Sequence, residues 1–199
     1  MENVPEVIGT NNVKHFAKWL EKLESLGYHC YWQVLNAKDY GIPQNRERCF
    51  MVSILGDYFY EFPEKIKLEH KLKDLLEENV DEKYFIKGKF LRHIKNTLQI
   101  GINYDNFDRY NGELEMWCRV WKDIAPTLNT KSKYTKIYDN KNNIRTLTEI
   151  ECFRLMGVKD KDFENIAQNQ SDASLYHLAG DSIVVDVLMA IFRKMLKNC

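Results

Sequence analysis

Hydrophobic positions recur at helical spacing near the start of the chain. Within residues 14–26 they are separated by lysines and glutamates, which is typical of a helix with one buried face. Gly27 follows directly and is a natural helix stop. The pattern therefore predicts a helix over residues 14–26. Its expected buried face consists of Phe16, Trp19, Leu20, Leu23 and Leu26.

Two short apolar runs come next. Residues 28–35 are rich in aromatic and β-branched side chains, and residues 49–55 form a second run of similar length. The segment between them, residues 36–48, contains Gly41 and Pro43 and is predicted to be a loop. Because two strands joined by a loop of this length can pair, we expect an antiparallel hairpin.

The middle of the chain shows weaker periodicity. Residues 57–82 are strongly charged, with a short helical stretch near Leu72, Leu75 and Leu76. Residues 83–143 mix aromatic side chains with Asn, Gly and Asp, which favours a small β-rich lobe with loops.

Helical patterns return in the last quarter of the sequence. Residues 148–151 form a capping box that opens a helix, and Gly157 closes it. The last helix is predicted to begin near Ser182. One apolar face of that helix is expected to contain Val184, Val185, Leu188, Ile191, Phe192 and Met195.

Composition indicates a folded protein. Of 199 residues, 44% are hydrophobic and 29% are charged, so the chain can form a packed core. No apolar run approaches the ~20 residues that span a membrane, and the polar N-terminus does not resemble a secretory signal. We therefore expect a cytoplasmic protein that does not associate with membranes.

Charge is distributed unevenly along a chain whose net charge is zero. Residues 83–147 contain 13 Lys and Arg against 6 Asp and Glu, a net charge of 13 − 6 = +7. A basic segment of this kind is typical of a nucleic-acid-binding surface. A solvated, loop-rich face explains the charge equally well.

The five cysteines do not form a metal-binding pattern. They make no CxxC pair, and no Cys/His cluster has the spacing of zinc ligands, so no metal is expected. None of them follows a proline. We interpret these thiols as buried or incidental.

Four segments together resemble the late motifs of the DNA cytosine-5 methyltransferase family. The first is Glu-Asn-Val at residues 2–4, and the second is DYGIPQNRER at residues 39–48. The third is RTLTEIECFRLMG at residues 145–157, and the fourth is AGDSIVV at residues 179–185. Their order and spacing agree with the family over essentially the whole chain.

The resemblance implies an α/β fold. Residues 1–82 and 144–199 would form the C-terminal half of a Rossmann-like methyltransferase domain that depends on S-adenosylmethionine. Residues 83–143 would form a small, mainly β target-recognition domain, because the family carries its variable recognition region between the second and third motifs.

Catalytic roles also follow from the resemblance. In the family a cysteine thiolate adds to C6 of a cytosine that has left the helix stack, and the methyl group then moves to C5. Carried over onto this chain, Glu2 would hold or donate a proton at the ring N3, and Arg48 would hydrogen-bond O2. Arg46 would support the thiolate and the base pocket.

Ligand contacts are implied as well. Asp181 and Ser182 would contact S-adenosylmethionine at the start of the last helix, where free backbone N–H groups favour a carboxylate. Pro126-Thr127-Leu128 resembles the Thr-Leu signature of the recognition region. The residues expected to contact double-stranded DNA are Arg119, Thr127, Lys131 and Lys133.

Two departures from the family pattern change this picture. The family's glycine-rich donor loop and Pro-Cys nucleophile precede Glu-Asn-Val, which here begins at residue 2. Asp181 also stands where the family commonly has Asn. We therefore expect a split enzyme whose N-terminal methyltransferase chain supplies the missing motifs. The alternative is a truncated remnant that binds DNA without catalysis. The target DNA sequence and any accompanying restriction enzyme are not readable from these residues.

Overall fold

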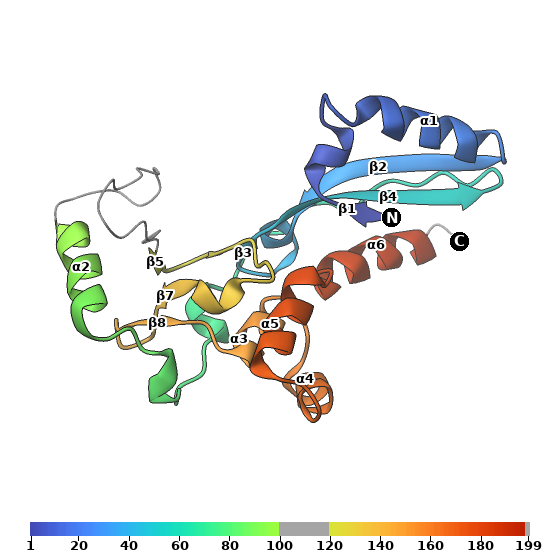
Figure 1. The fold of residues 1–199 in the computed structure, drawn as a ribbon. Helices are drawn as coiled ribbons and strands as arrows, with labels where there is room; N and C mark the ends of the chain where they lie inside the picture. The colour runs from blue at the N-terminus through green and yellow to red at the C-terminus, as the bar shows by residue number, and fades with distance from the viewer. Residues whose placement is uncertain (100–119, 198–199) are drawn as a thin grey trace. The chain divides into compact units, whose positions relative to one another are not determined.

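The computed structural model describes residues 1–99 and 120–197 (Figure 1). The chain divides into two compact units. Unit 1 comprises Met1–His70 and Ser182–Cys199, and unit 2 comprises Lys71–Asp181. Unit 1 is therefore built from two stretches of chain that are far apart in the sequence.

Unit 1 contains a three-stranded antiparallel sheet in the order β1-β4-β2. The strands are β1 (Glu2–Asn3), β2 (Tyr28–Asn36) and β4 (Glu47–Leu55). The register between β2 and β4 runs from Tyr28 opposite Leu55 to Asn36 opposite Glu47. The predicted hairpin is thus confirmed, with each strand slightly longer than its apolar run.

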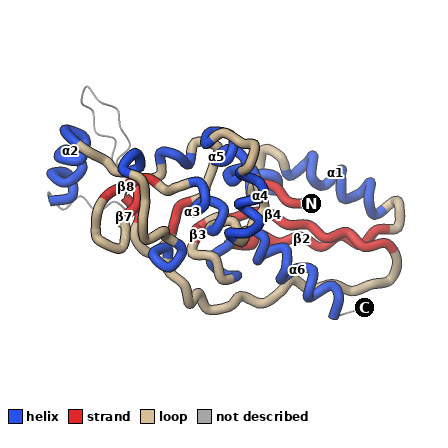
Figure 2. The backbone as a smooth tube through the Cα atoms, turned by 90° about the horizontal axis from the view of Figure 1, so that it is seen from below, coloured by secondary structure: helices blue, strands red, loops and turns tan. Residues whose placement is uncertain are grey.

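Helices flank this sheet on both sides. α1 (Val13–Glu24) and α6 (Val185–Lys197) lie on opposite sides of it in both views (Figures 1 and 2). Phe16 and Leu20 of α1 form a core cluster with Met51 of β4. Trp19 and Leu26, which were expected on the buried face, are exposed. The remaining elements of unit 1 are the 3-10 helices η1 (Pro5–Ile8) and η2 (Ala37–Tyr40) and the strand β3 (Gln44–Asn45).

The last helix differs from its prediction in its first residue and in which of its side chains are buried. It begins at Val185, three residues after Ser182. Val184, Leu188, Ile191 and Met195 lie on the inner side as expected, together with Val187, which is buried. Val185 and Phe192, however, are exposed, so the prediction was wrong for these two side chains.

Unit 2 has a second three-stranded sheet in the order β5-β7-β8. β5 runs parallel to β7, and β7 runs antiparallel to β8. The strands of this unit are β5 (Val120–Trp121), β6 (Ala125–Pro126), β7 (Lys136–Tyr138) and β8 (Ile144–Thr146). Its helices are η3 (Leu72–Leu75), η4 (Glu82–Tyr84), α2 (Gly88–Gln99), η5 (Ser132–Tyr134), α3 (Glu149–Arg154), α4 (Asp160–Ala167) and α5 (Asp172–Asp181).

The capping box predicted at Thr148 is confirmed. The Thr148 hydroxyl accepts from the Glu151 backbone N–H at 3.3 Å, and the Glu151 carboxylate accepts from the Thr148 N–H at 2.9 Å. Gly157 follows α3 with a φ of 77°.

Residues 83–143 contain the helix α2 as well as short strands, so the prediction that they are mainly β is only partly met. The division into catalytic and recognition domains stays a prediction, because compact units report contacts and not function.

Gly180 near the end of α5 is packed too closely for any side chain. A Cβ atom there would overlap the backbone of Asn129 and Thr130. We expect Gly180→Ala to lower the free energy of unfolding by about 3 kcal/mol, because backbone atoms cannot yield as a flexible side chain can. Urea unfolding measures this loss. Gly9→Ala, where the nearest atom is the Glu6 carbonyl oxygen at 3.2 Å, should cost much less, and equal losses would contradict this account.

One region is apolar and long enough to cross a membrane by composition alone, namely Asp172–Leu196. It is not one continuous helix, since residues 182–184 between α5 and α6 are not helical. Leu175 and Ala179 of α5 and Ile191 of α6 are buried inside the protein. Buried side chains of this kind are typical of helices that pack on a protein core.

Candidate active site and DNA-contact residues

Glu2 and Arg48, two predicted catalytic residues, lie side by side on the sheet of unit 1. β1 pairs with β4 so that Glu2 stands opposite Phe50, two residues from Arg48 along the strand. The Arg48 Nε lies 3.1 Å from the Glu2 Oε1, and both side chains are 17% exposed. The chain end is held as well, since the Met1 ammonium group donates to the Met51 carbonyl at 2.7 Å.

One oxygen of the Glu2 carboxylate has no hydrogen-bond donor among the described residues. The Glu2 Oε1 is buried and accepts no hydrogen bond from the residues that the structure describes, although Arg48 is within ion-pair distance. The two observations agree if the Arg48 N–H is not aimed at the oxygen. Because a buried carboxylate oxygen is costly to leave without a donor, the charge of Arg48 is what stabilises Glu2 in this position.

Arg46, the third predicted catalytic residue, is buried at the base of the same segment. Its Nη2 donates to the Ser182 carbonyl at 2.9 Å. A buried guanidinium must be paired or hydrogen-bonded, and here a partner comes from the turn just before α6. Arg46 therefore joins the loop of the second motif to the turn of the fourth motif.

The loop that carries these arginines is closed by local contacts. Asn36 donates through its amide to the Asn45 side chain at 2.7 Å, and the Ala37 N–H donates to the Arg46 carbonyl at 3.0 Å. Gly41 has a φ of 96°, a conformation that a residue with a Cβ rarely adopts. The turn places Arg46 in the interior and Arg48 on β4.

Asp181 and Ser182 occupy a different setting from the one expected. Asp181 is the last residue of α5 and not part of a helix start, so the predicted helix N-terminus at this position was wrong. The Asp181 carboxylate lies 3.1 Å from Nδ1 of His177, one turn earlier on the same helix. The Asp181 side chain is 61% exposed and accessible to a ligand.

Three of the four predicted DNA contacts lie on one exposed segment of unit 2. Thr127, Lys131 and Lys133 are all exposed, and Arg119 lies outside the described residues. Leu128 and Ser132 anchor the segment and are fully buried, with the Ser132 hydroxyl donating to the Asn129 carbonyl at 2.6 Å. Three polar side chains are thus presented to solvent on a fixed backbone.

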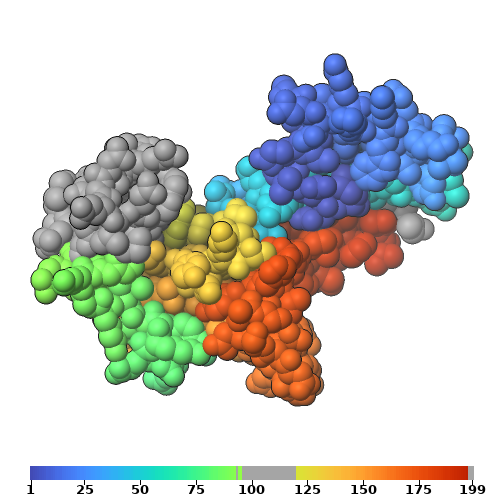
Figure 3. Space-filling model, viewed as in Figure 1, coloured from blue at the N-terminus to red at the C-terminus, as the bar shows by residue number. Residues whose placement is uncertain are grey.

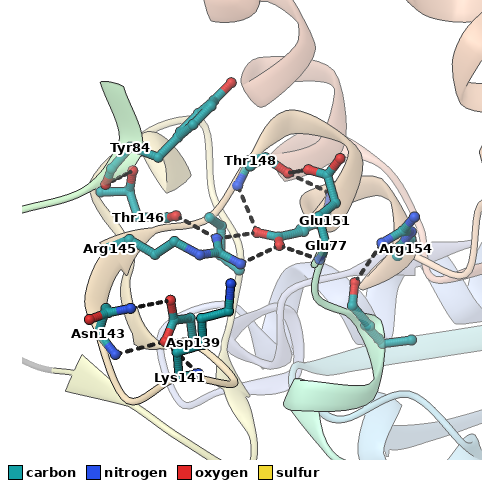
Figure 4. A network of polar contacts seen from close by, with 12 residues as sticks. Glu77, Tyr84, Asp139, Lys141, Asn143, Arg145, Thr146, Thr148, Glu151 and Arg154 are labelled. Atoms are coloured by element: carbon teal, nitrogen blue, oxygen red, sulfur yellow. Dashed lines mark hydrogen bonds and ion pairs between the residues drawn. The ribbon is translucent and has the colours of Figure 1, made fainter. Parts of the chain in front are cut away.

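A buried ion pair organises the interior of unit 2 (Figure 4). The Arg145 guanidinium binds both carboxylate oxygens of Glu151, at 2.7 and 2.6 Å, and both side chains are almost fully buried. The same carboxylate accepts from the backbone N–H of Glu77 at 2.9 Å. The sequence did not indicate Glu77 as a partner, because it lies 74 residues away and belongs to no motif.

The two buried cysteines, Cys49 and Cys152, do not have the setting of a nucleophile. Burial raises the pKa of the Cys49 thiol. Burial and the neighbouring carboxylates of Glu151 and Glu149 raise the pKa of Cys152 well above its usual range. Reactive thiols require a lowered pKa, whereas the pKa of each of these two thiols is raised. The Cys30 Sγ lies 3.2 Å from the Ser53 hydroxyl, while Cys118 and Cys199 lie outside the described residues.

The mixed α/β fold of the described residues is that of part of a methyltransferase domain. Solved structures of methyltransferases share this fold. The Entamoeba histolytica methyltransferase EhMeth has a TM-score of 0.68 at 18% identity, covering 98% of this chain and 60% of that one. Dnmt2 of S. pombe has a TM-score of 0.70 at 16% identity, covering 98% and 63%.

The chain belongs to the C-5 cytosine-specific DNA methylase family, whose model matches residues 1–197. The Type II methyltransferase M2.ScrFI of Lactococcus lactis subsp. cremoris is 40% identical over 200 residues, covering 100% of this chain and 54% of that protein. M.Bsp6I of Bacillus sp. (strain RFL6) is 33% identical, covering 100% and 64%. The chain therefore spans about half to two thirds of the length of these relatives.

Proposed function

We propose that this chain supplies the base pocket and the DNA-recognition part of a DNA cytosine-5 methyltransferase. The observation that carries the proposal is the placement of Glu2 beside Arg48 on adjacent strands, where both side chains are 17% exposed. The names of several relatives, Type II methyltransferases, support a restriction-modification setting and a site of action in the cytoplasm.

Glu2 and Arg48 act together on a cytosine that has left the DNA stack. Glu2 holds a proton at the ring N3, which stabilises the charge that develops when a nucleophile adds to C6. Arg48 donates to the cytosine O2 and fixes the ring in the pocket. Arg46 is a positioning residue, because its contact with the Ser182 carbonyl holds the loop that leads to Arg48.

S-adenosylmethionine supplies the electrophilic methyl group when it is bound. The chemistry of Asp181 and Ser182 fits a contact with this donor, since an exposed carboxylate accepts from ammonium and hydroxyl groups and a serine hydroxyl both donates and accepts. The fit rests on these side chains and not on a helix dipole, because Asp181 ends α5.

The exposed segment that contains Thr127, Lys131 and Lys133 binds the backbone of double-stranded DNA. Lysine ammonium groups neutralise phosphates, so this part of the affinity falls as salt concentration rises. Such contacts position the enzyme on the duplex and do not read sequence. Arg119, which lies outside the described residues, is proposed as a further DNA contact on its sequence position alone.

The nucleophile is supplied by a complementing N-terminal methyltransferase segment. Two features support this assignment, namely that no cysteine of the sequence follows a proline and that Cys49 and Cys152 have raised pKa values. The competing function is DNA binding without catalysis, which the exposed lysines alone would allow.

Transfer of labelled methyl from S-adenosylmethionine to mixed-sequence DNA tests the proposal. We expect no incorporation with this chain alone and incorporation after co-expression with the polypeptide encoded immediately upstream. Incorporation by this chain alone would contradict the need for a second segment. No incorporation in either case, with DNA binding retained, would favour the non-catalytic function.

A further inference from the structure

A pocket of about 530 Å³ with aromatic walls lies within unit 1. Its walls are residues 30–33 of β2, residues 60–62 and 64 of the segment after β4, and Lys194 of α6. We call it the aromatic pocket. The first residues of β2 and the last turn of α6 lie at the same end of unit 1 (Figures 1 and 3). The pocket shares no residue with the four motifs or with the proposed DNA contacts, so methyl transfer leaves it without a role.

Uncharged aromatic rings form much of the wall. The ring centroids of Tyr31 and Tyr60 are 5.8 Å apart, and those of Tyr60 and Phe62 are 5.2 Å apart, both in edge-to-face contact. Contacts of this kind hold the rings in place. Burial raises the pKa of Tyr60 to about 12, so its hydroxyl stays neutral near pH 7. Trp32, a further wall residue, is 45% exposed and open to a ligand.

The charge of the aromatic pocket is negative. Residues 57–64, DYFYEFPE, contain three acidic side chains and neither Lys nor Arg. Two of the three, Glu61 and Glu64, line the pocket together with the ammonium group of Lys194, so the formal charge of its walls is 1 − 2 = −1. The Lys194 Nζ lies 3.8 Å from the Glu61 carboxylate, whereas Glu64 is exposed and forms no ion pair with the described residues. One carboxylate thus already attracts a cation of the chain itself, and the other can attract a second.

We infer that the aromatic pocket binds an arginine side chain of a partner protein. A guanidinium group is flat and positively charged, so it stacks on an aromatic face. It also carries several N–H donors, and two of them can bind one carboxylate such as that of Glu64. This inference goes beyond the proposed function, because it concerns neither the methyl group nor the DNA.

Ligands of other chemistry match the walls less well. The phosphates of DNA and the head groups of anionic lipids are repelled by a pocket with a net negative charge. A purely apolar ligand would cover the Glu64 carboxylate without giving it a hydrogen bond, which is costly. An ammonium group is a compact and strongly hydrated charge, and it stacks on flat rings less well than a guanidinium group does. A planar cation therefore matches both the rings and the charge.

Nuclear magnetic resonance titration of the full chain with N-acetylarginine amide tests the inference. The probe should shift the indole N–H signal of Trp32 in a saturable way, and Trp32→Phe assigns that signal. The citrulline analogue has nearly the same shape but no charge, and it should bind at least ~10-fold more weakly. Glu64→Gln should weaken binding of the arginine probe about fivefold or more. Glu69→Gln is the matched control, because Glu69 is exposed in the same segment but outside the pocket, and it should change the affinity less than about twofold.

Lys194→Gln should act in the opposite direction. Removal of the ammonium group frees Glu61 and takes away a positive charge that repels the probe. Binding of the arginine probe should therefore become about two- to fivefold tighter. Unchanged or weaker binding by this variant would contradict the inference, because the negative charge of the pocket would then not attract the ligand.

Further results would also overturn the inference. They are no saturable shift, equal affinities for the arginine and citrulline probes, binding unaffected by Glu64→Gln, and tighter binding of spermidine, which would assign the pocket to free polyamines. A Trp32 signal that moves only with protein concentration would show instead that a second copy of the chain fills the pocket. Urea midpoints identify any variant with a damaged fold, and the comparison of the two probes needs no variant. Glu64→Gln should leave methyl transfer with the complementing segment unchanged, so this inference and the proposed function can fail independently.

Discussion

Arg48→Ala is expected to lower methyl transfer by a factor of about 10²–10³ when the complementing segment is present, because one donor that stabilises developing charge on the ring is removed. Arg48→Lys should recover little of the activity, since a point charge does not reproduce the planar donors of a guanidinium. The measurement is the single-turnover rate of label transfer to DNA at saturating S-adenosylmethionine.

The control for Arg48→Ala is the neighbouring residue of the same triplet. Glu47 is exposed on β4 and its substitution by alanine should leave the rate nearly unchanged. Both side chains of the Arg48–Glu2 pair are only 17% exposed, so the urea midpoint of Arg48→Ala must be measured beside its rate to separate lost activity from lost stability. A variant that keeps most of its rate would remove Arg48 from the base pocket.

Arg145→Leu should be the most destabilising single substitution that we predict, with a loss of about 3–5 kcal/mol. The change leaves the Glu151 carboxylate buried without its cation, and two backbone N–H donors cannot neutralise its charge. Urea unfolding followed by circular dichroism measures the loss. The double variant Arg145→Leu, Glu151→Leu should recover part of it, because no charge then stays buried.

An exposed pair of similar length provides the comparison. Lys87 Nζ lies 2.6 Å from Glu82 Oε2, as close as the Arg145–Glu151 contact, but both side chains are well exposed. Lys87→Ala should therefore leave the urea midpoint nearly unchanged. Similar losses for Lys87→Ala and Arg145→Leu would mean that burial does not set the strength of the Arg145–Glu151 pair.

Local sequence signals predicted the elements whose cause is local. The β2–β4 hairpin follows from two apolar runs, and α3 follows from its capping box, because each of these patterns acts within a few residues. The helix α1 was placed within two residues at each end. The exposure of Trp19 was not predictable, since helical periodicity defines a face but not how much of it the rest of the protein covers.

The candidate site was predicted unevenly for the same reason. The motif residues Glu2 and Arg48 do lie together, which family resemblance implied and spacing alone would not reveal. The end of α5 at Asp181 was missed because Asp and Ser are equally good signals of a helix start. The link between Arg46 and Ser182 has no local signature at all, because it depends on how α6 packs in unit 1.

The Arg46–Ser182 hydrogen bond has a consequence for biosynthesis. It joins residues 136 positions apart, and unit 1 is made from the first 70 residues and the last 18. During translation the β2–β4 hairpin is synthesised early. The helix α6 can pack beside it only after the whole of unit 2 has been synthesised. Contacts of such high sequence separation slow folding and expose apolar surface in the interval. Unit 2 is continuous in the sequence, so all of its segments are synthesised before α6, whose packing completes the contact between Arg46 and Ser182.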